Sequence, residues 1–174
     1  MQQLTRTRPP GRRQPSAYWA AFAVVMLLIA SIALPFLWQG RISGDTAQRI
    51  AEEVALHHLK LKPLDVEADQ MPALAAYFTR LDFAVRDSSL VAEVGGTSLL
   101  GGRYCSILDV PAAQLRLQRA PGQMLTLYEA AYDPQAFPNL PNVDQGEPPL
   151  VQYARGIRVA IWVEKGLLFV LAGE

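Results

Sequence analysis

The sequence predicts an α+β protein with one N-terminal transmembrane helix, followed by a small domain of two helices packed on an antiparallel β-sheet of hairpins. Three patterns predict this fold class. Residues 18–38 carry no charged side chain. Apolar residues then recur with a helical period between residues 45 and 81, and with a period of two in several stretches from residue 103 onward.

Composition limits the chain to one domain with an appendage. It has 174 residues, a formal net charge of zero, one Cys and two His, which excludes an intramolecular disulfide framework and a Cys-rich zinc module. Residues 1–17, predicted to be a short basic cytoplasmic tail, contain four Arg and no acidic residue, so the remainder is mildly acidic. We therefore expect no nucleic-acid partner.

Residues 18–38 are predicted to form the transmembrane helix, with the lipid bilayer as its partner. A helix of this length measures about 31 Å, close to the roughly 30 Å of a bilayer's hydrocarbon core, and aromatic residues stand at both of its ends. The basic tail places the N-terminus in the cytoplasm. In a bacterium this means a single-pass inner-membrane protein with a periplasmic C-terminal domain. A cleaved signal peptide is the alternative, because residues 31–33 suit a signal peptidase.

Two amphipathic helices are expected after the span. Residues 39–62 predict a juxtamembrane helix, which Asp45 caps and Pro63 stops. Its apolar face would consist of Ala47, Ile50, Val54 and Leu59. A second helix is predicted from Met71 to Leu81 with Asp69 as its cap. One side of this helix would carry Leu74, Tyr77, Phe78 and Leu81.

The outer domain, residues 63–174, is predicted to fold around β-hairpins. The expected strands are 103–108, 114–118, 124–129, 157–163 and 167–171. Turns are expected at residues 120–122 and 164–166, each of which contains Gly. Between the hairpins, residues 133–150 contain five Pro, which excludes a helix or a central strand. This Pro-rich loop is either a surface connection or a lid or partner-docking segment.

The order of these pieces resembles the extracytoplasmic domain of single-pass transmembrane anti-sigma factors, over residues 47–174. The matching pieces are Leu64-Asp65-Val66 with Asp69-Gln70, Tyr77-Phe78, Leu81-Asp82-Phe83, Leu100-Gly101-Gly102-Arg103, Ala112-Ala113-Gln114-Leu115, and Gly156, Trp162 and Gly166-Leu167-Leu168-Phe169. The resemblance implies a short strand, an aromatic-bearing helix and two hairpins. Such factors usually carry a cytoplasmic sigma-binding domain, often with a His-x-x-x-Cys-x-x-Cys zinc motif. We expect neither here, because about seventeen residues precede the span and they hold no Cys or His.

No catalytic, cofactor or metal site is predicted, and no small-molecule substrate is evident. His57 and His58 are the only imidazoles, and Cys105 has no neighbour in sequence except Arg103 that would lower its pKa. We therefore expect Cys105 to be a buried, inert thiol whose side chain shares a strand face with that of Arg103. Glu53 and His57 are four residues apart, a spacing that suits two metal ligands but is more typical of solvated side chains.

Trp162 points away from the apolar row of its predicted strand, beside Arg158. Either the sheet is covered on both faces, or Trp162 is exposed and forms a protein-binding patch. The predicted partner contacts are Arg158 and Trp162 on the strand, and Phe137 and Leu140 in the Pro-rich loop.

The function predicted from these patterns is not enzymatic. The chain is expected to be a membrane-anchored periplasmic module that is anti-sigma-factor-like, sensory or regulatory, and acts by contact with a periplasmic or membrane protein. The alternative is a small single-pass accessory subunit of a larger membrane complex.

Overall fold

The computed structural model describes residues 17–119 and 122–173, which form parts of two compact units, Met1–Trp38 and Gln39–Glu174. The predicted basic tail lies, apart from Ala17, outside the described residues. One helix, α1 (Ala17–Lys60), contributes to both units. Each unit is therefore considered by itself.

In the first unit, α1 carries a run of exposed apolar side chains. Their exposed fractions lie between 51% and 70%, and they belong to Phe22, Val24, Val25, Met26, Leu27, Leu28 and Ile29. No helix in the described part of the chain is both long and apolar enough to cross a membrane. The predicted span 18–38 falls largely on residues whose side chains lie outside the described ones.

The predicted start of the helix 39–62 is wrong, because no separate helix begins there and α1 runs without interruption from Ala17 to Lys60. The expected break near Asp45 does not form, since Gly40 and Gly44 inside the helix each cost only about 1 kcal/mol and do not end it. The apolar face is confirmed for most of its predicted members. Its buried residues are Ala47, Ile50, Ala51, Val54 and Ala55. Leu59, however, is exposed.

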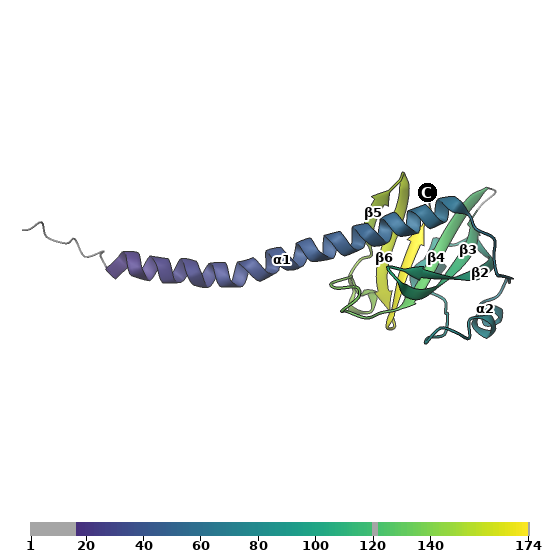
Figure 1. Cartoon of the computed structure of the whole chain (residues 1–174), viewed down its shortest axis with the longest axis horizontal. Coiled ribbons are helices and arrows are strands. Elements are labelled where there is room, and N and C mark those ends of the chain that lie inside the picture. Colours follow the sequence, from purple (N-terminus) through teal and green to yellow (C-terminus); the bar gives the residue numbers. More distant parts are fainter. Residues whose placement is uncertain (1–16, 120–121, 174) are drawn as a thin grey trace, which may run out of the picture. The chain divides into compact units, whose positions relative to one another are not determined.

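The second unit is built on a seven-stranded antiparallel sheet, which confirms the α+β class (Figure 1). The strands are β1 (Val66–Glu67), β2 (Thr97–Ile107), β3 (Val110–Arg119), β4 (Gln123–Ala131), β5 (Leu150–Ala154), β6 (Ile157–Glu164) and β7 (Leu167–Ala172). Their order across the sheet is β1-β2-β3-β4-β7-β6-β5. Two meanders, β2–β4 and β5–β7, are therefore joined where β4 pairs with β7.

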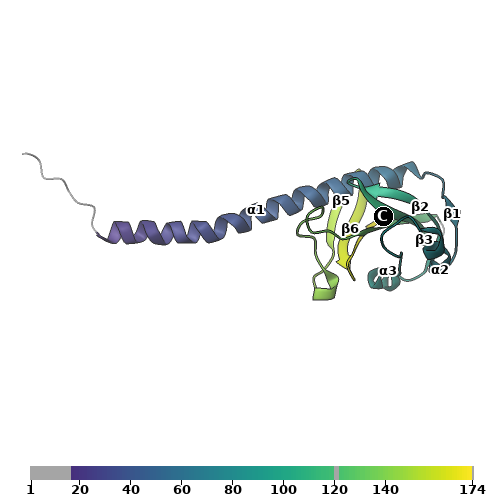
Figure 2. The same ribbon diagram turned by 60° about the horizontal axis from the view of Figure 1, so that its bottom comes forward.

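The end of α1 covers one face of this sheet (Figure 1). The other face is covered by the segment that carries α2 (Met71–Tyr77) and α3 (Ser89–Val94), as Figure 2 shows. The predicted second helix ends early, at Tyr77 and not at Leu81, and its N-cap is Gln70 instead of Asp69. Phe78 leaves the helical conformation with ψ of 53°.

Because both faces are covered, Trp162 is 1% exposed and stacks on Phe169 with ring centroids 5.7 Å apart. Of the two alternatives for Trp162, the sheet covered on both faces is confirmed, and the exposed patch that would make Trp162 a partner contact is wrong. Phe137 and Leu140, 0% and 6% exposed, belong to the core beneath α1, so the structure also contradicts their role as partner contacts. Arg158, half-buried, does not form a patch with them.

The Pro-rich loop is a connection that packs into the core through Phe137 and Leu140 and is exposed at residues 133–136 and 144–148. It contains a short 3-10 helix, η1 (Val143–Gln145), and β5 begins at its predicted last residue, Leu150. Asn142 forms an isolated parallel bridge with Val163, which ties the loop to β6.

Candidate functional site

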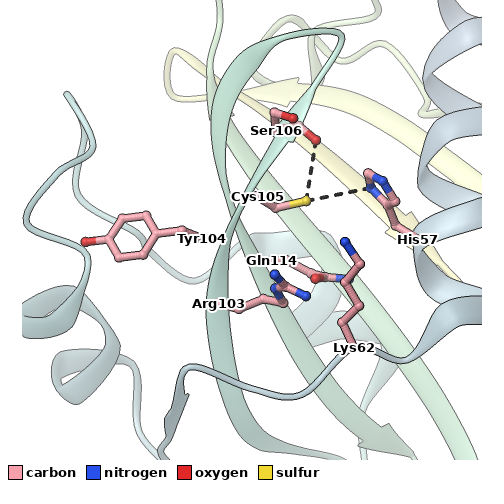
Figure 3. A pocket seen from close by; sticks show the side chains of 7 residues that line it. All are labelled: His57, Lys62, Arg103, Tyr104, Cys105, Ser106 and Gln114. Atoms are coloured by element: carbon pink, nitrogen blue, oxygen red, sulfur yellow. Dashed lines mark hydrogen bonds between the residues drawn. The ribbon is translucent and has the colours of Figure 1, made fainter.

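The strongest candidate site in the second unit is a pocket of about 400 Å³ beside the end of α1. The link that follows α1 forms one wall, and β2 and β3 form another (Figure 3). Its lining residues are His57, Lys62, Arg103, Tyr104, Cys105, Ser106 and Gln114. Most of these residue types carry a positive charge or a polar hydrogen-bonding group.

Strand alternation in β2 decides which side chains face the pocket. Arg103 and Cys105 share the face that α1 covers, as the sequence predicted (Figure 3). Tyr104 points the other way and packs against Phe78, with ring centroids 5.0 Å apart, while the Arg80 guanidinium lies 4.0 Å from the centre of its ring. The side chain of Tyr104 therefore belongs to the opposite core and contributes only its backbone to the pocket.

Cys105 and His57 meet across the pocket wall, 48 positions apart in the sequence. The thiol Sγ lies 3.7 Å from Nδ1 of His57 and donates to the backbone oxygen of Ser106 at 3.5 Å. Burial raises the pKa of the Cys105 thiol, and burial also lowers the pKa of His57. The pair therefore consists of a thiol and a neutral imidazole at neutral pH. This is not the thiolate–imidazolium pair of a cysteine nucleophile.

This contact was missed by sequence reasoning, which placed Cys105 in a fully buried strand position. The thiol is half-buried, and its partner comes from a helix whose position on the sheet no local pattern gives. A helical-face argument does place Glu53 and His57 together. Both side chains face the sheet and not solvent: Glu53 Oε2 accepts a hydrogen bond from the backbone N–H of Leu108 at 3.0 Å. Among the described residues, no group of three or more possible metal ligands gathers.

Two cations face this pocket. The Lys62 backbone is held in place because Arg116 Nη2 donates to its carbonyl oxygen at 2.6 Å. The Arg103 Nε donor is buried and has no hydrogen-bond partner among the described residues. Beside it, Gln114 donates to the Tyr128 hydroxyl at 2.9 Å, which fixes the Gln114 amide in the buried wall.

His58 lies on the neighbouring side of the helix and does not enter the pocket. Its Nδ1 is 2.8 Å from Oγ1 of Thr126 on β4. Burial lowers the pKa of His58, and the positive charge of Arg116 lowers it further. The two predicted imidazoles thus both attach α1 to the sheet.

A second polar feature lies on the opposite face of the sheet, where two buried carboxyl groups hold the segment before α3. Glu129 Oε2 accepts from the backbone N–H of Arg86 at 3.0 Å, and its Oε1 has no partner among the described residues. Glu164 accepts from the Ser88 hydroxyl at 2.7 Å and from the Ser89 N–H. Both carboxyl groups are buried, so these contacts are made away from solvent.

Comparison of this chain with protein-family models, with curated proteins and with solved structures finds no match. The function must therefore be argued from the geometry and the sequence patterns.

Proposed function

We propose that this chain is a membrane-anchored, extracytoplasmic regulatory module that acts by contact with a partner protein and not by catalysis. The observation that carries the proposal is the exposed apolar run on α1 between Phe22 and Ile29. A contiguous apolar surface of this kind marks a membrane or protein interaction site, because water contact with it is unfavourable. With the uncharged stretch 18–38, it supports an anchor in the bacterial inner membrane and an outer domain in the periplasm.

The protonation states of Cys105 and His57 support a binding role for the pocket. A neutral thiol and a neutral imidazole supply no activated nucleophile. The order of sequence pieces that resembles anti-sigma factor outer domains favours a regulatory function over a purely structural one.

A partner contact is proposed at the edge strand β5, since the residues first expected to form it are buried. Tyr153 is 69% exposed, and Val151 lies two residues away, so both side chains share one face of that strand. Among the described residues no further strand pairs with the outer edge of β5, which leaves backbone groups for a partner strand.

The test has two stages. The full-length chain, expressed in its native host, should stay in the membrane pellet after an alkaline carbonate wash, and its release would contradict the anchor. Purification in mild detergent with mass spectrometry should then recover a sigma or anti-sigma component under envelope stress. Tyr153→Ser should abolish this recovery, whereas Ser98→Ala, at an exposed site on β2, should not.

Recovery of a constant set of integral membrane proteins in near-equal amounts, with and without stress, would overturn the regulatory role. That result would identify an accessory subunit of a larger membrane complex.

A further inference from the structure

We propose that the pocket beside Cys105 binds a phosphate group, either on a small soluble molecule or on a lipid headgroup. This inference goes beyond the proposed regulatory function and does not depend on it. It rests on the charges that line the pocket, on a buried donor that lacks an acceptor, and on the arrangement of the remaining polar groups.

The charge argument comes first. Lys62 and Arg103 both line the pocket, and no Asp or Glu in the described part of the chain lines it. Figure 3 shows the guanidinium of Arg103 and the ammonium of Lys62 directed toward the same space. Two like charges that face the same space repel each other, and an anion between them removes this repulsion. Two carboxylates lie beside the lining, and both are bonded to backbone N–H groups: Glu53 accepts from Leu108 at 3.0 Å, and Asp65 accepts from Tyr104 at 2.9 Å.

Other charged groups near the pocket do not change this balance. Lys60 and Lys62 on the α1 side, and Arg103 on β2, all act to lower the pKa of His57, and Glu53 alone raises it. Burial raises the pKa of the Cys105 thiol. The positive charges of Arg103 and Lys62 act in the opposite direction, but their effect is smaller. The charge around the pocket is therefore positive before any proton binds to His57.

The buried donor is the second, independent observation. The Nε–H of Arg103 is inaccessible to solvent and has no acceptor in the described chain. A buried donor without a partner costs about 1–3 kcal/mol, and more when it belongs to a charged group. A phosphate in the pocket does not reach this nitrogen, but it would accept charge-assisted hydrogen bonds from the part of the Arg103 guanidinium that lines the pocket and so offset the cost of burying this group.

The polar groups around the pocket favour phosphate over a planar carboxylate. Donors can approach from β2 through Arg103, from the link after α1 through Lys62, and from α1 through the His57 ring. Donors from three directions suit a tetrahedral group with several oxygens, and two cations suit its charge of roughly −1.5 to −2 at neutral pH. A volume of about 400 Å³ leaves room for an organic part attached to the phosphate.

Cys105 provides the readout, because it is the single Cys of the chain and lines the pocket. The full-length protein in an uncharged detergent is alkylated with N-ethylmaleimide, with and without inorganic phosphate or glycerol phosphate. At a phosphate concentration ten times the Kd, alkylation should slow about tenfold, since only the free pocket reacts. Sodium chloride of equal ionic strength is the control for general screening.

Matched variants identify the groups responsible. Arg103→Gln and Lys62→Gln should each weaken the protection about tenfold or more, whereas Lys60→Gln, which lies outside the pocket lining, should leave it unchanged. The Lys62 side chain is exposed, so its variant tests the proposal even if Arg103→Gln fails to fold.

The source of the phosphate follows from a second arm, in which the chain is reconstituted in vesicles. Protection by soluble phosphate assigns a soluble ligand. Protection only in vesicles that contain phosphatidic acid, whose phosphate is a monoester like that of glycerol phosphate, and not in phosphatidylcholine vesicles, assigns a lipid headgroup. Alkylation that is equally fast under all conditions, or protection that Lys62→Gln and Lys60→Gln reduce equally, overturns the proposal. None of these outcomes depends on whether a partner protein is recovered.

Discussion

Glu129 is a carboxyl group that the fold keeps from water, and it makes stability depend on pH. Burial raises its pKa to about 8, from a value of 4.5 in the absence of the fold. Between these values the folded state holds a proton that the unfolded state releases, so its stabilising contribution is complete below pH 4.5 and is lost by about pH 8. We predict that Glu129→Gln removes this loss.

The measurement is thermal unfolding of the full-length chain and the variant in neutral detergent across this pH range. The difference in Tm between Glu129→Gln and the native chain should grow in favour of the variant as pH rises. His57 and His58, whose lowered pKa values make stability fall toward acid pH, are present in both proteins and cancel from the difference. A difference that is constant with pH would contradict the prediction.

Glu164 is the matched contrast on the same face of the sheet. Burial acts to raise its pKa, but hydrogen bonds from Ser88 and Ser89 outweigh burial and lower it. Its ionised form therefore stabilises the fold above the ordinary carboxyl pKa, and that contribution is lost as pH falls through the lowered value. Glu164→Gln should destabilise the protein most at neutral pH, the reverse of the pattern for Glu129→Gln, in the same unfolding experiment.

Gly101 allows a close approach between two strands. Its φ is +143°, and an added Cβ would collide with the backbone oxygen of Val66 and lie 2.9 Å from Cα of Glu67. Gly101→Ala should destabilise the domain by about 2–4 kcal/mol in denaturant unfolding, because backbone strain and a clash with β1 add together. Gly156→Ala, at φ of +79° with nothing within 4 Å, should cost only about 1–2 kcal/mol. Equal losses would show that the contact with β1 is unimportant.

At the scale of elements, α1 carries two adjacent acidic residues, Glu52 and Glu53, and only Glu53 helps to attach the helix to the sheet. Glu53 accepts from the N–H of Leu108, a residue with φ of +47°, whereas Glu52 forms an exposed ion pair with Arg155 at 3.3 Å. We predict that Glu53→Ala costs about 1–3 kcal/mol in denaturant unfolding. Glu52→Ala should cost under about 1 kcal/mol. The reverse order would contradict this role for Glu53.

The elements also show what sequence alone could predict. The C-terminal hairpin was predicted nearly to the residue, because β6 alternates cleanly and Lys165-Gly166 suits a turn with φ of +49° and +76°. The hairpin between β2 and β3 was missed, because its turn residues, Leu108 and Asp109, adopt φ of +47° and +68° without any Gly. A tertiary contact from Glu53 supports that turn, and no local pattern contains it.

The candidate site could also be predicted only in part from the sequence. Alternation along β2 correctly placed Arg103 and Cys105 on one face. It did not indicate that His57 and Lys62 would face them, since this depends on how α1 packs across the sheet. Trp162 illustrates the same limit, because its burial depends on a covering segment with only two short helices.

On the scale of the whole molecule, the sheet consists of two meanders that are continuous in sequence. The first, β2–β4, follows α1 in the chain, and the second, β5–β7, is complete after residue 149. The meanders pair through a single strand contact, in which residues 126–131 of β4 face residues 167–172 of β7. The core under α1 draws side chains from both meanders.

This arrangement makes the protein a natural pair of complementing fragments. A break between Glu147 and Pro148, within an exposed stretch, would separate the two meanders without interrupting any strand. Co-expressed fragments 1–147 and 148–174 should copurify and bury Trp162, as its fluorescence would report when Trp19 and Trp38 are replaced by Phe, whereas fragment 148–174 alone should remain unstructured. If the fragments fail to associate, the covalent connection through the Pro-rich loop is itself required for the sheet to assemble. If they do associate, each half could carry one part of a split reporter, and the reporter would register the assembly of this domain in a cell.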